Sequence, residues 1–568
     1  MNKMIKVATV QFEPIQFEKQ RNIDKLSKLI IEAAEQGAQL IVVPEMATTG
    51  YCFKNREEIA PYVETIPGST TAHFEKIAKQ YSCWLVIGMP EVVEETNLYF
   101  NSAVLISPEG IAGLHRKTHP YIAETRWAAN GDLGHQVFDT AIGKISLLIC
   151  MDIHFIETAR LVAVQGAQLI CHLSNWLDER TPAPYWLTRA WENHIPIIES
   201  NRWGYERGVK FSGGSCIIDH EGVPLQVIDR GDAVAVCDIE LKSENPVLSK
   251  RKPKHYALLH TNTYTWNPID LFNLYAIEKL PQAKQSHISC AQFKPNDDVA
   301  HNVQSIRQFI EKAHHQNCEL VVFPEKVLTG FNKQNALNQY DEIFNTLIDL
   351  CCQYNLHIII GYIEQALTQK FNSAQVIGPQ GIVGHYRQIH INEKDMQWCS
   401  AGEEWLFVDI PCGRVGVLLG EDLYIPEAAR VLALSGCDII ACAANLSTPK
   451  PLAHSGTFVP QSYPIPTGAD AYHQLLPRVR AGENNVWLAF ANSEYQTEES
   501  FGLSGIYSPE TFTFPRYEIK LPKGKGLVSL EISTGEKQEL HPSHVVRRKD
   551  LVRMRQPHYY TALLKHNL

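Results

Sequence analysis

The chain lacks several features that mark particular classes of protein. Its 14 cysteines include no C-x-x-C pair and no small-scaffold spacing, so we expect reduced thiols. No basic run is interleaved with aromatic residues, and the formal net charge of -10 argues against nucleic acid or an anionic membrane as main partner. No apolar run approaches the roughly 20 residues of a membrane-spanning helix. Neither metal-ligand spacing nor an ATP-binding motif is present, so we expect no metal and no cofactor.

The beginning and the composition of the chain indicate an ordinary globular protein. Of its 568 residues, 45% are hydrophobic and 20% are charged, which suits roughly two to four domains that each bury a full core. The opening letters, MNKMIKVATVQF, enter a strand-like pattern at once, without an apolar signal-peptide region. We therefore expect a cytoplasmic protein, and homo-oligomers of the whole chain are compatible with this expectation.

An internal repeat covers nearly the whole chain. The repeated segments include GAQLIVVPEMATTGY with NCELVVFPEKVLTGF, NSAVLISPEGIAGLHRKTH with NSAQVIGPQGIVGHYRQIH, RAWENHIPIIESN with RAGENNVWLAFAN, and RKPKHYALL with RQPHYYTALL. We therefore expect two copies of one domain, at residues 1–280 and 285–568, joined by the polar stretch EKLPQAKQS.

Within each copy, short β-branched runs alternate with helical patterns. AQLIVVPE, CWLVIGMPE and KISLLICMD indicate strands, and NSAVLISPEGIAGLHRK indicates a hairpin-like pair of strands. NIDKLSKLIIEAAEQGA places apolar residues at helical spacing and ends near Gly37, a suitable C-cap. The alternation predicts a layered α+β domain in which helices cover a sheet.

Three residues of the first copy that could share one reaction each follow a strand-like run. Glu45 follows LIVVP, Lys117 follows GLHR, and Cys150 follows SLLI. A cysteine attacks carbonyl-type carbon well, but its ordinary pKa of about 8.5 leaves little thiolate at neutral pH. A carboxylate could accept its proton, and a lysine could supply a positive field and donate to the developing oxyanion. The sequence alone does not show that the three side chains meet.

The segments around these residues resemble those of a known family. PEMATTGY, HRKTH and LLICMDIHFIETAR are similar to the three signature segments of the nitrilase, or carbon–nitrogen hydrolase, superfamily, and SNW, RAWEN and NRWG match further segments. The resemblance extends over both copies. It implies two four-layer α-β-β-α sandwich domains in one chain, packed as an intramolecular pseudo-dimer, and a Glu–Lys–Cys catalytic triad.

Carried over position by position, the resemblance gives each candidate a role. Cys150 would be the nucleophile, and Glu45 the general base that takes its proton, protonates the leaving ammonia or amine and later activates water. Lys117, with the backbone N–H of Met151, would form the oxyanion hole. Glu124 would position substrate or water and keep the lysine oriented. Two aromatic residues match positions that line the acyl pocket in relatives: Tyr51 and Trp176.

The second copy has lost most of this set. Aligning the copies places Gln388 at the position of the lysine, Asp395 at that of the second glutamate and Gly420 at that of the cysteine. Glu325, the counterpart of the first glutamate, is retained. Because glycine offers no nucleophile and glutamine carries no charge, we expect a degenerate, non-catalytic second domain.

The resemblance leaves several functions open. The letters CMD at the nucleophile favour an amidase that hydrolyses a small non-peptide linear amide or carbamoyl compound through a cysteine thioester, releasing ammonia or an amine. The short step from Lys117 to Glu124, followed by a tryptophan, favours instead a nitrilase that converts a nitrile to an acid and ammonia. An acyltransferase that uses an amine acceptor and a non-enzymatic scaffold are the remaining alternatives.

Overall fold

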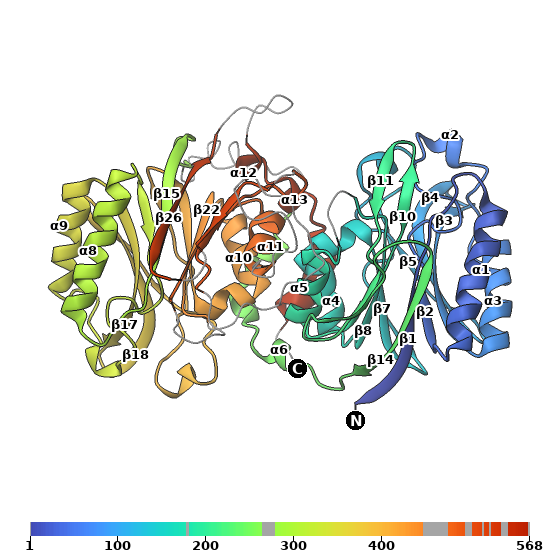
Figure 1. Ribbon diagram of the computed structural model, residues 1–568, viewed down its shortest axis with the longest axis horizontal. Coiled ribbons are helices and arrows are strands. Elements are labelled where there is room, and N and C mark those ends of the chain that lie inside the picture. Colours follow the sequence, from blue (N-terminus) through green and yellow to red (C-terminus); the bar gives the residue numbers. More distant parts are fainter. Residues whose placement is uncertain are drawn as a thin grey trace.

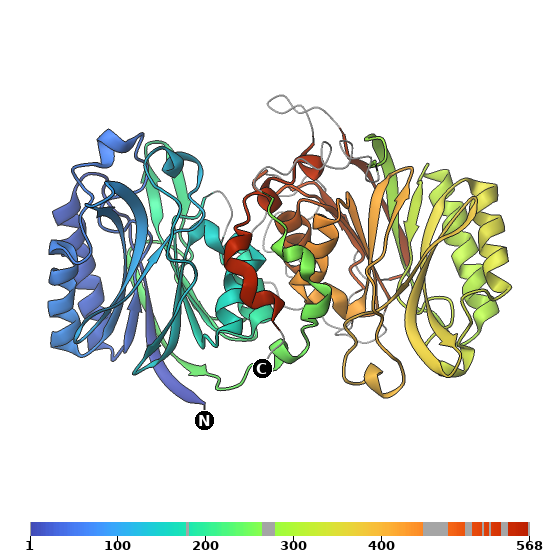
Figure 2. The ribbon, with the colours of Figure 1, turned by 180° about the vertical axis from the view of Figure 1, so that it is seen from behind.

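The computed structural model describes two similar α+β halves, which lie side by side along the long axis of the molecule (Figures 1 and 2). The first half comprises residues 2–263 and the second half residues 279–565. Some stretches fall outside the described residues: 178–180, 264–278, 447–474, 495–501, 514–515, 522–523 and 536–543. The first residue of the expected linker EKLPQAKQS is among them. Within the described ranges, no helix combines the length and the apolar character that crossing a membrane requires.

The first half is a sandwich of two six-stranded sheets, each with three parallel central strands and antiparallel flanking strands. The outer sheet has the order β14 (Ala233–Leu241), β1 (Lys3–Gln11), β2 (Leu40–Val42), β3 (Trp84–Val93), β4 (Leu98–Ser107), β5 (Gly110–Arg116). The inner sheet has the order β13 (Pro224–Val227), β12 (Cys216–Ile218), β9 (Ile197–Asn201), β8 (Leu169–Ser174), β7 (Gly143–Ile149), β6 (Val137–Thr140). The two sheets enclose one continuous apolar core.

Helices cover the outer face of each sheet of the first half (Figure 1). On the outer sheet these are α1 (Lys19–Glu35) and α3 (Ser69–Tyr81), and on the inner sheet α4 (Ile156–Val164) and α5 (Pro184–Asn193). Shorter elements are α2 (Arg56–Ile59), η1 (Ile122–Arg126), η2 (Cys150–His154), β10 (Trp203–Glu206), β11 (Val209–Ser212), α6 (Pro246–Ser249), η3 (Pro253–His255) and η4 (Ala257–His260).

The second half repeats this arrangement. Its outer sheet has the order β19 (Gly381–Arg387), β18 (Gln369–Gly378), β17 (His357–Ala366), β16 (Leu320–Val322), β15 (Gln285–Gln292), β26 (Gly526–Ser533), covered by α8 (Val299–His315) and α9 (Ile343–Tyr354). Its inner sheet has the order β20 (Phe407–Ile410), β21 (Gly413–Leu419), β22 (Ile439–Ala444), β23 (Trp487–Asn492), β24 (Gly505–Tyr507), β25 (Glu518–Lys520), covered by α10 (Pro426–Leu434) and α11 (Leu475–Asn484). Shorter elements are η5 (Lys333–Asn335), η6 (Asp395–Gln397), η7 (Gly420–Tyr424), α12 (Val545–Arg548), α13 (Asp550–Arg553) and η8 (Pro557–Leu564).

The local sequence patterns account for these elements. The three β-branched runs fall on β2, β3 and β7, and the predicted pair of strands is β4 with β5. Helix α1 begins slightly before its predicted segment and buries Ile23, Leu26 and Ile30, which lie on one face at helical spacing. Gly37 follows the helix with a φ of +85°, a left-handed conformation that glycine adopts without strain. The predicted fold class, two α-β-β-α sandwiches in one chain, is confirmed.

The two halves meet through the helices that cover their inner sheets (Figure 1). Arg189 on α5 donates from Nη2 to Glu483 Oε2 on α11 at 2.6 Å, and Arg480 Nη2 on α11 lies 2.7 Å from Glu192 Oε2 on α5. All four side chains are fully buried. In the repeat, Arg189 and Glu192 correspond to Arg480 and Glu483, so the contact is reciprocal, as at a two-fold interface.

A second reciprocal set of buried ion pairs lies between α4, α10 and the segments that end the two halves. Burial alone would raise the pKa of Glu427, but Arg160 and Arg251 lower it to about 2. Glu157 likewise has a lowered pKa because two arginines of the second half outweigh the effect of its burial. Both acids are therefore charged at neutral pH. The cross-half pairs are Glu157 with Arg430 and Arg555, and Glu427 with Arg160 and Arg251.

The last segment of the second half crosses to the first half. Gln556 donates from Nε2 to the Thr118 carbonyl oxygen at 2.6 Å, and the Tyr559 hydroxyl donates to the Gly131 carbonyl oxygen at 3.2 Å. These contacts fall at the two ends of the stretch 118–131, which follows β5. The second half therefore supports the part of the chain that follows Lys117.

We expect Arg480→Leu to lower the free energy of unfolding of the full chain by about 3–5 kcal/mol, because it removes one partner of a buried ion-pair group. The control is Lys254→Leu, which removes an exposed ion pair between Lys254 and Glu403 that joins the same two halves. This control should have little effect, because water already solvates both charges. Denaturant unfolding followed by circular dichroism measures both changes, and a small loss in both variants would contradict the importance assigned to the buried group.

Candidate active site

Cys150 lies where strand β7 ends and the 3-10 turn η2 begins. Its φ is +44°, a left-handed conformation that is strained for a residue with a Cβ. At the matching place in the second half, Gly420 has a φ of +45°. The two halves thus share one backbone turn, and strain of about 1–3 kcal/mol is present only where the cysteine is retained.

Glu45, Lys117 and Glu124 form a buried charged group beside the cysteine. Nζ of Lys117 lies 2.7 Å from Glu45 Oε1 and 2.5 Å from Glu124 Oε2. The side-chain amide of Asn101 donates to Oε1 of both glutamates, at 2.7 and 2.6 Å. Glu45 Oε2 is buried and accepts no hydrogen bond from the described residues. This oxygen is therefore available to accept a proton.

The charges and the burial of this group shift its pKa values. Burial raises the pKa of Glu45 above the ordinary value of 4.5, opposed by Lys117 and assisted by Glu124. Burial would lower the pKa of Lys117, but the two glutamates raise it well above its ordinary value. Burial, and then Glu45, raise the pKa of Cys150 well above its ordinary value. The resting cysteine is therefore a thiol, next to a carboxylate that holds a proton more readily than usual.

Asp152 joins the nucleophile turn to the lysine segment. Its Oδ2 accepts from the backbone N–H of Ile149 at 3.1 Å. Its Oδ1 accepts from the backbone N–H groups of Thr118 and His119, at 3.2 and 3.1 Å. Because one carboxylate bonds to both chain segments, the lysine and the cysteine are held at a fixed separation.

A buried histidine fixes the carbonyl group of Cys150 from the other side. His172 Nε2 lies 3.1 Å from the Cys150 carbonyl oxygen, and its Nδ1 is hydrogen-bonded to Glu199. Burial would lower the pKa of His172, but Glu199 raises it above its ordinary value. A protonated Nε2 donates to the carbonyl oxygen, which restricts the left-handed turn further.

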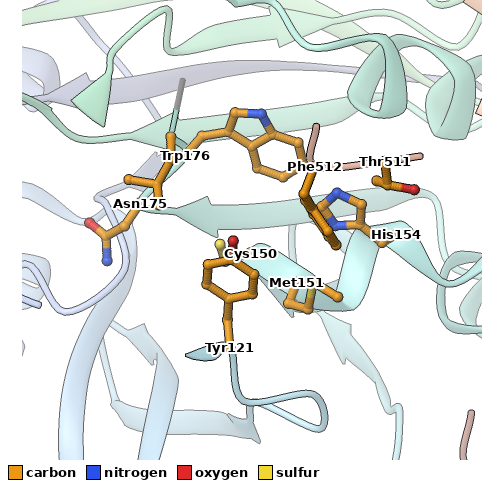
Figure 3. Close-up of a pocket in the computed structure, with 9 residues that line it drawn as sticks. Tyr121, Cys150, Met151, His154, Asn175, Trp176, Thr511 and Phe512 are labelled. Carbon is orange, nitrogen blue, oxygen red and sulfur yellow. The ribbon is translucent and has the colours of Figure 1, made fainter. Parts of the chain in front are cut away.

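A cavity of about 50 Å³ opens beside Cys150 (Figure 3). Trp176 lines it, with its ring stacked on His154 at a centroid distance of 4.8 Å, and Met151 also lines it. Tyr51 belongs to the charged group beside the cavity: its hydroxyl donates to Glu124 Oε2 at 2.8 Å, and it is not among the described residues that line the cavity itself. Two lining residues come from the second half: Thr511 and Phe512.

The corresponding site of the second half keeps a charged group but has Gly420 at the position of the nucleophile. Lys326 Nζ lies 2.9 Å from Glu325 Oε1 and 3.3 Å from Asp395 Oδ2. The cation thus comes from the residue after Glu325, because Gln388 at the aligned lysine position is neutral. A Cβ added at Gly420 would lie 2.5 Å from Glu325 Oε2, closer than real Cβ contacts. The sequence shows that the lysine is lost but not that another lysine replaces its charge.

Among the described residues, His194, His220 and Glu221 bring metal-ligating atoms close together. His194 Nδ1 lies 3.5 Å from Glu221 Oε1, and His220 Nε2 lies 3.9 Å from the same oxygen. The fold brings His194, at the end of α5, to the turn after β12, which linear spacing does not reveal. None of the three lines the Cys150 cavity, so the chemistry at Cys150 does not involve them.

Comparison with known proteins identifies the class. The family model described as carbon-nitrogen hydrolase matches residues 6–246 and again residues 287–514. A protein named nitrilase from Pyrococcus abyssi is 36% identical over 263 residues, which are 44% of this chain and 99% of the relative. A probable nitrilase from Schizosaccharomyces pombe is 30% identical over 251 residues, and the match covers 42% of this chain and 90% of the relative. The chain belongs to the carbon-nitrogen hydrolase family and carries the family domain twice.

Further relatives have other names within the same class. A citrullinase from Francisella tularensis is 30% identical over 251 residues, which are 40% of this chain and 87% of the relative. A solved amidase structure from Nesterenkonia sp. is 25% identical, with a TM-score of 0.38 over 42% of this chain and 91% of that one. The family model and the curated relatives give the class of reaction as hydrolysis of a carbon–nitrogen bond.

Sequence reasoning missed two kinds of site residue. Asn101 could have been found from the sequence, because the letters NSA recur unchanged in both copies. In the structure its counterpart Asn372 also donates to a glutamate, Glu325, at 2.9 Å. Thr511 and Phe512 gave no signal, because they lie in the second half in a segment without a counterpart motif. Only the packing of the two halves brings them to Cys150.

We expect kcat/KM to fall as the pH drops through the raised pKa of Glu45, because a base acts only when deprotonated. The acidic limb should therefore lie above pH 4.5. Activity should persist into alkaline solution, because the pKa of Lys117 is raised and its positive charge is retained. Initial rates in a constant-ionic-strength buffer series, with circular dichroism at each pH, provide the test. An acidic limb below pH 4.5 in folded protein would show that Glu45 is not the titrating base.

Proposed function

We propose that the chain is an amidase that hydrolyses a small non-peptide linear amide or carbamoyl compound through a thioester on Cys150. The observation that carries the proposal is the buried group in which Lys117 is paired with Glu45 and Glu124 next to a cysteine in a strained turn. If Cys150 were only an inert core thiol, its turn would not need a strained backbone, and if the ion pairs were only structural, they would not need to be buried beside it. Perturbed ionisable groups beside a cavity are typical of catalytic sites.

In the proposed first step, Glu45 accepts the thiol proton through its free Oε2 while Cys150 Sγ attacks the amide carbon. The carbonyl oxygen becomes an oxyanion, which Lys117 and the backbone N–H of Met151 stabilise. Protonated Glu45 then gives its proton to the amide nitrogen, the carbon–nitrogen bond breaks, and ammonia or an amine leaves. The acyl group remains bonded to Sγ as a thioester.

In the second step, Glu45 takes a proton from a water molecule, whose oxygen attacks the thioester carbon. The sulfur leaves, takes back the proton, and the free acid is released. Glu124 keeps Lys117 oriented throughout, since it accepts a hydrogen bond from Nζ, while the Tyr51 hydroxyl and the Asn101 amide hold Glu124 in turn. No metal or cofactor takes part in this scheme.

We further propose that residues 1–280 and 285–568 are two domains in an intramolecular pseudo-dimer and that only the first is catalytic. The reciprocal ion pairs between α5 and α11 support the pseudo-dimer. Gly420 in place of a nucleophile supports the second statement. The whole chain would act as one catalytic unit with one site.

A nitrilase reaction is the second candidate, because the Pyrococcus abyssi and Schizosaccharomyces pombe relatives are named nitrilase and probable nitrilase. Transfer of the acyl group from the thioester to an amine is a third. Ammonia release from a panel of amides and the matching nitriles, with and without added hydroxylamine, separates the three. Acid from amides supports the amidase, acid from nitriles alone supports the nitrilase, and mainly hydroxamate supports the acyltransferase.

We expect Cys150→Ala to abolish turnover, since no other group can form the thioester, while the fold is retained because the two side chains differ little in volume. Iodoacetamide should inactivate the unmodified enzyme in step with alkylation of Cys150, whereas alkylation of the exposed Cys352 should not affect activity. The matched control is Cys352→Ala, which removes an exposed cysteine and should leave kcat unchanged. More than a few per cent of activity remaining in pure Cys150→Ala protein would disprove covalent catalysis at this residue.

A further inference from the structure

The cavity beside Cys150 has walls from both halves of the chain (Figure 3). The ring of Phe512, in the second half, contacts two rings of the first half. The distance between ring centroids is 5.7 Å to Tyr121 and 5.2 Å to His154. Thr511 next to it is buried and also lines the cavity. The cavity is therefore complete only when both halves are in place.

Phe512 is carried by a connection that differs between the two copies. In the second half, residues 508–517 connect β24 to β25, whereas in the first half only residues 219–223 connect the equivalent strands β12 and β13. The longer connection is the one that reaches the cavity of the intact catalytic group. It is held at its base, because Thr511 Oγ1 donates to the Gly482 carbonyl oxygen at 2.9 Å.

The chemical character of the cavity points to one class of acyl group. Apart from Cys150, the described lining residues are aromatic, apolar or neutral polar. Burial, and then the positive charge of Arg189, lower the pKa of His154 well below its ordinary value, so this ring is neutral at physiological pH. Arg189 itself is occupied by Glu192 and Glu483. No described lining residue is available to neutralise a charged acyl group.

We propose that Phe512 closes the acyl pocket and makes the enzyme selective for amides whose acyl group is small, neutral and apolar. This inference rests on the proposed hydrolysis at Cys150. The benzyl group of Phe512 forms the wall against which a longer acyl chain would collide. The non-catalytic half thus determines the substrate of the catalytic half.

Phe512→Ala in the full chain tests the size limit. Phe512 is 47% exposed, so its removal creates no cavity in a packed core. With a series from acetamide to hexanamide, the ratio of kcat/KM for hexanamide to that for propionamide should rise about 10-fold or more, as expected when a pocket wall is removed. Tyr517→Ala is the matched control, since Tyr517 belongs to the same connection, is 43% exposed and does not line the cavity. It should leave the ratio unchanged.

The charge selectivity has its own test. Succinamate has a charged acyl group of a length similar to that of pentanamide. The unmodified enzyme should show a kcat/KM for succinamate at least about 10-fold lower than for pentanamide, because burying an unpaired carboxylate is unfavourable. A preference for succinamate would overturn the neutral class. An unchanged chain-length ratio in Phe512→Ala would overturn the role of Phe512.

A readout independent of turnover separates this inference from the proposed function. Alkylation of Cys150 by iodoacetamide and by the bulkier N-phenyl iodoacetamide is followed by mass spectrometry of the peptide that contains Cys150. Phe512→Ala should accelerate the bulky reagent about 10-fold relative to the small one, and Tyr517→Ala should not. If this acceleration occurs but no amide is hydrolysed, the amidase proposal fails while closure by Phe512 stands. If amides are hydrolysed and the reagents show no difference, closure by Phe512 is wrong.

Discussion

A buried group of ion pairs joins the two halves, and much of the structure depends on this contact. It consists of Arg189, Glu192, Arg480 and Glu483. Separated halves would each leave an arginine and a glutamate on a helix face that is built to be buried. Removing one partner from such a group is far more costly than losing a surface pair. The same helices, α5 and α11, adjoin the nucleophile turn and the connection that carries Phe512. The ion pairs therefore fix the relative position of the two halves at the place where the cavity is formed.

Duplication explains why the second half keeps a folded site that has no nucleophile. Its turn retains the left-handed backbone of the first half, and Gly420 relieves the strain that Cys150 maintains. Glu325 remains buried, and a buried carboxylate needs a cation. Lys326 supplies that cation from a new position. The second site thus has glycine at the position of the cysteine, while its charge balance, and with it the fold around it, has been preserved.

The periodic patterns of the sequence predict most of the fold, because β-branched runs and the apolar face of α1 are local signals that the packing does not override. The repeat shows that Arg189 and Arg480 occupy equivalent positions. It does not show that each arginine forms an ion pair with a glutamate of the other half. Lys326 could not be predicted, since its replacement of a lysine far away in sequence depends on how the sheet places the ends of β16 and β19, which β17 and β18 separate. Phe512 could not be predicted either, because its place beside Cys150 arises only from contact between residues more than half the chain apart.

The central claim is that the second half forms part of the active site. It is tested most directly by producing residues 1–283 alone and then adding residues 279–568 as a separate chain, with size-exclusion chromatography and ammonia release measured before and after. The first fragment should self-associate or aggregate and be inactive despite containing Glu45, Lys117 and Cys150, and activity should appear when the second chain is added. A monomeric first fragment with the full activity of the intact chain would contradict the claim.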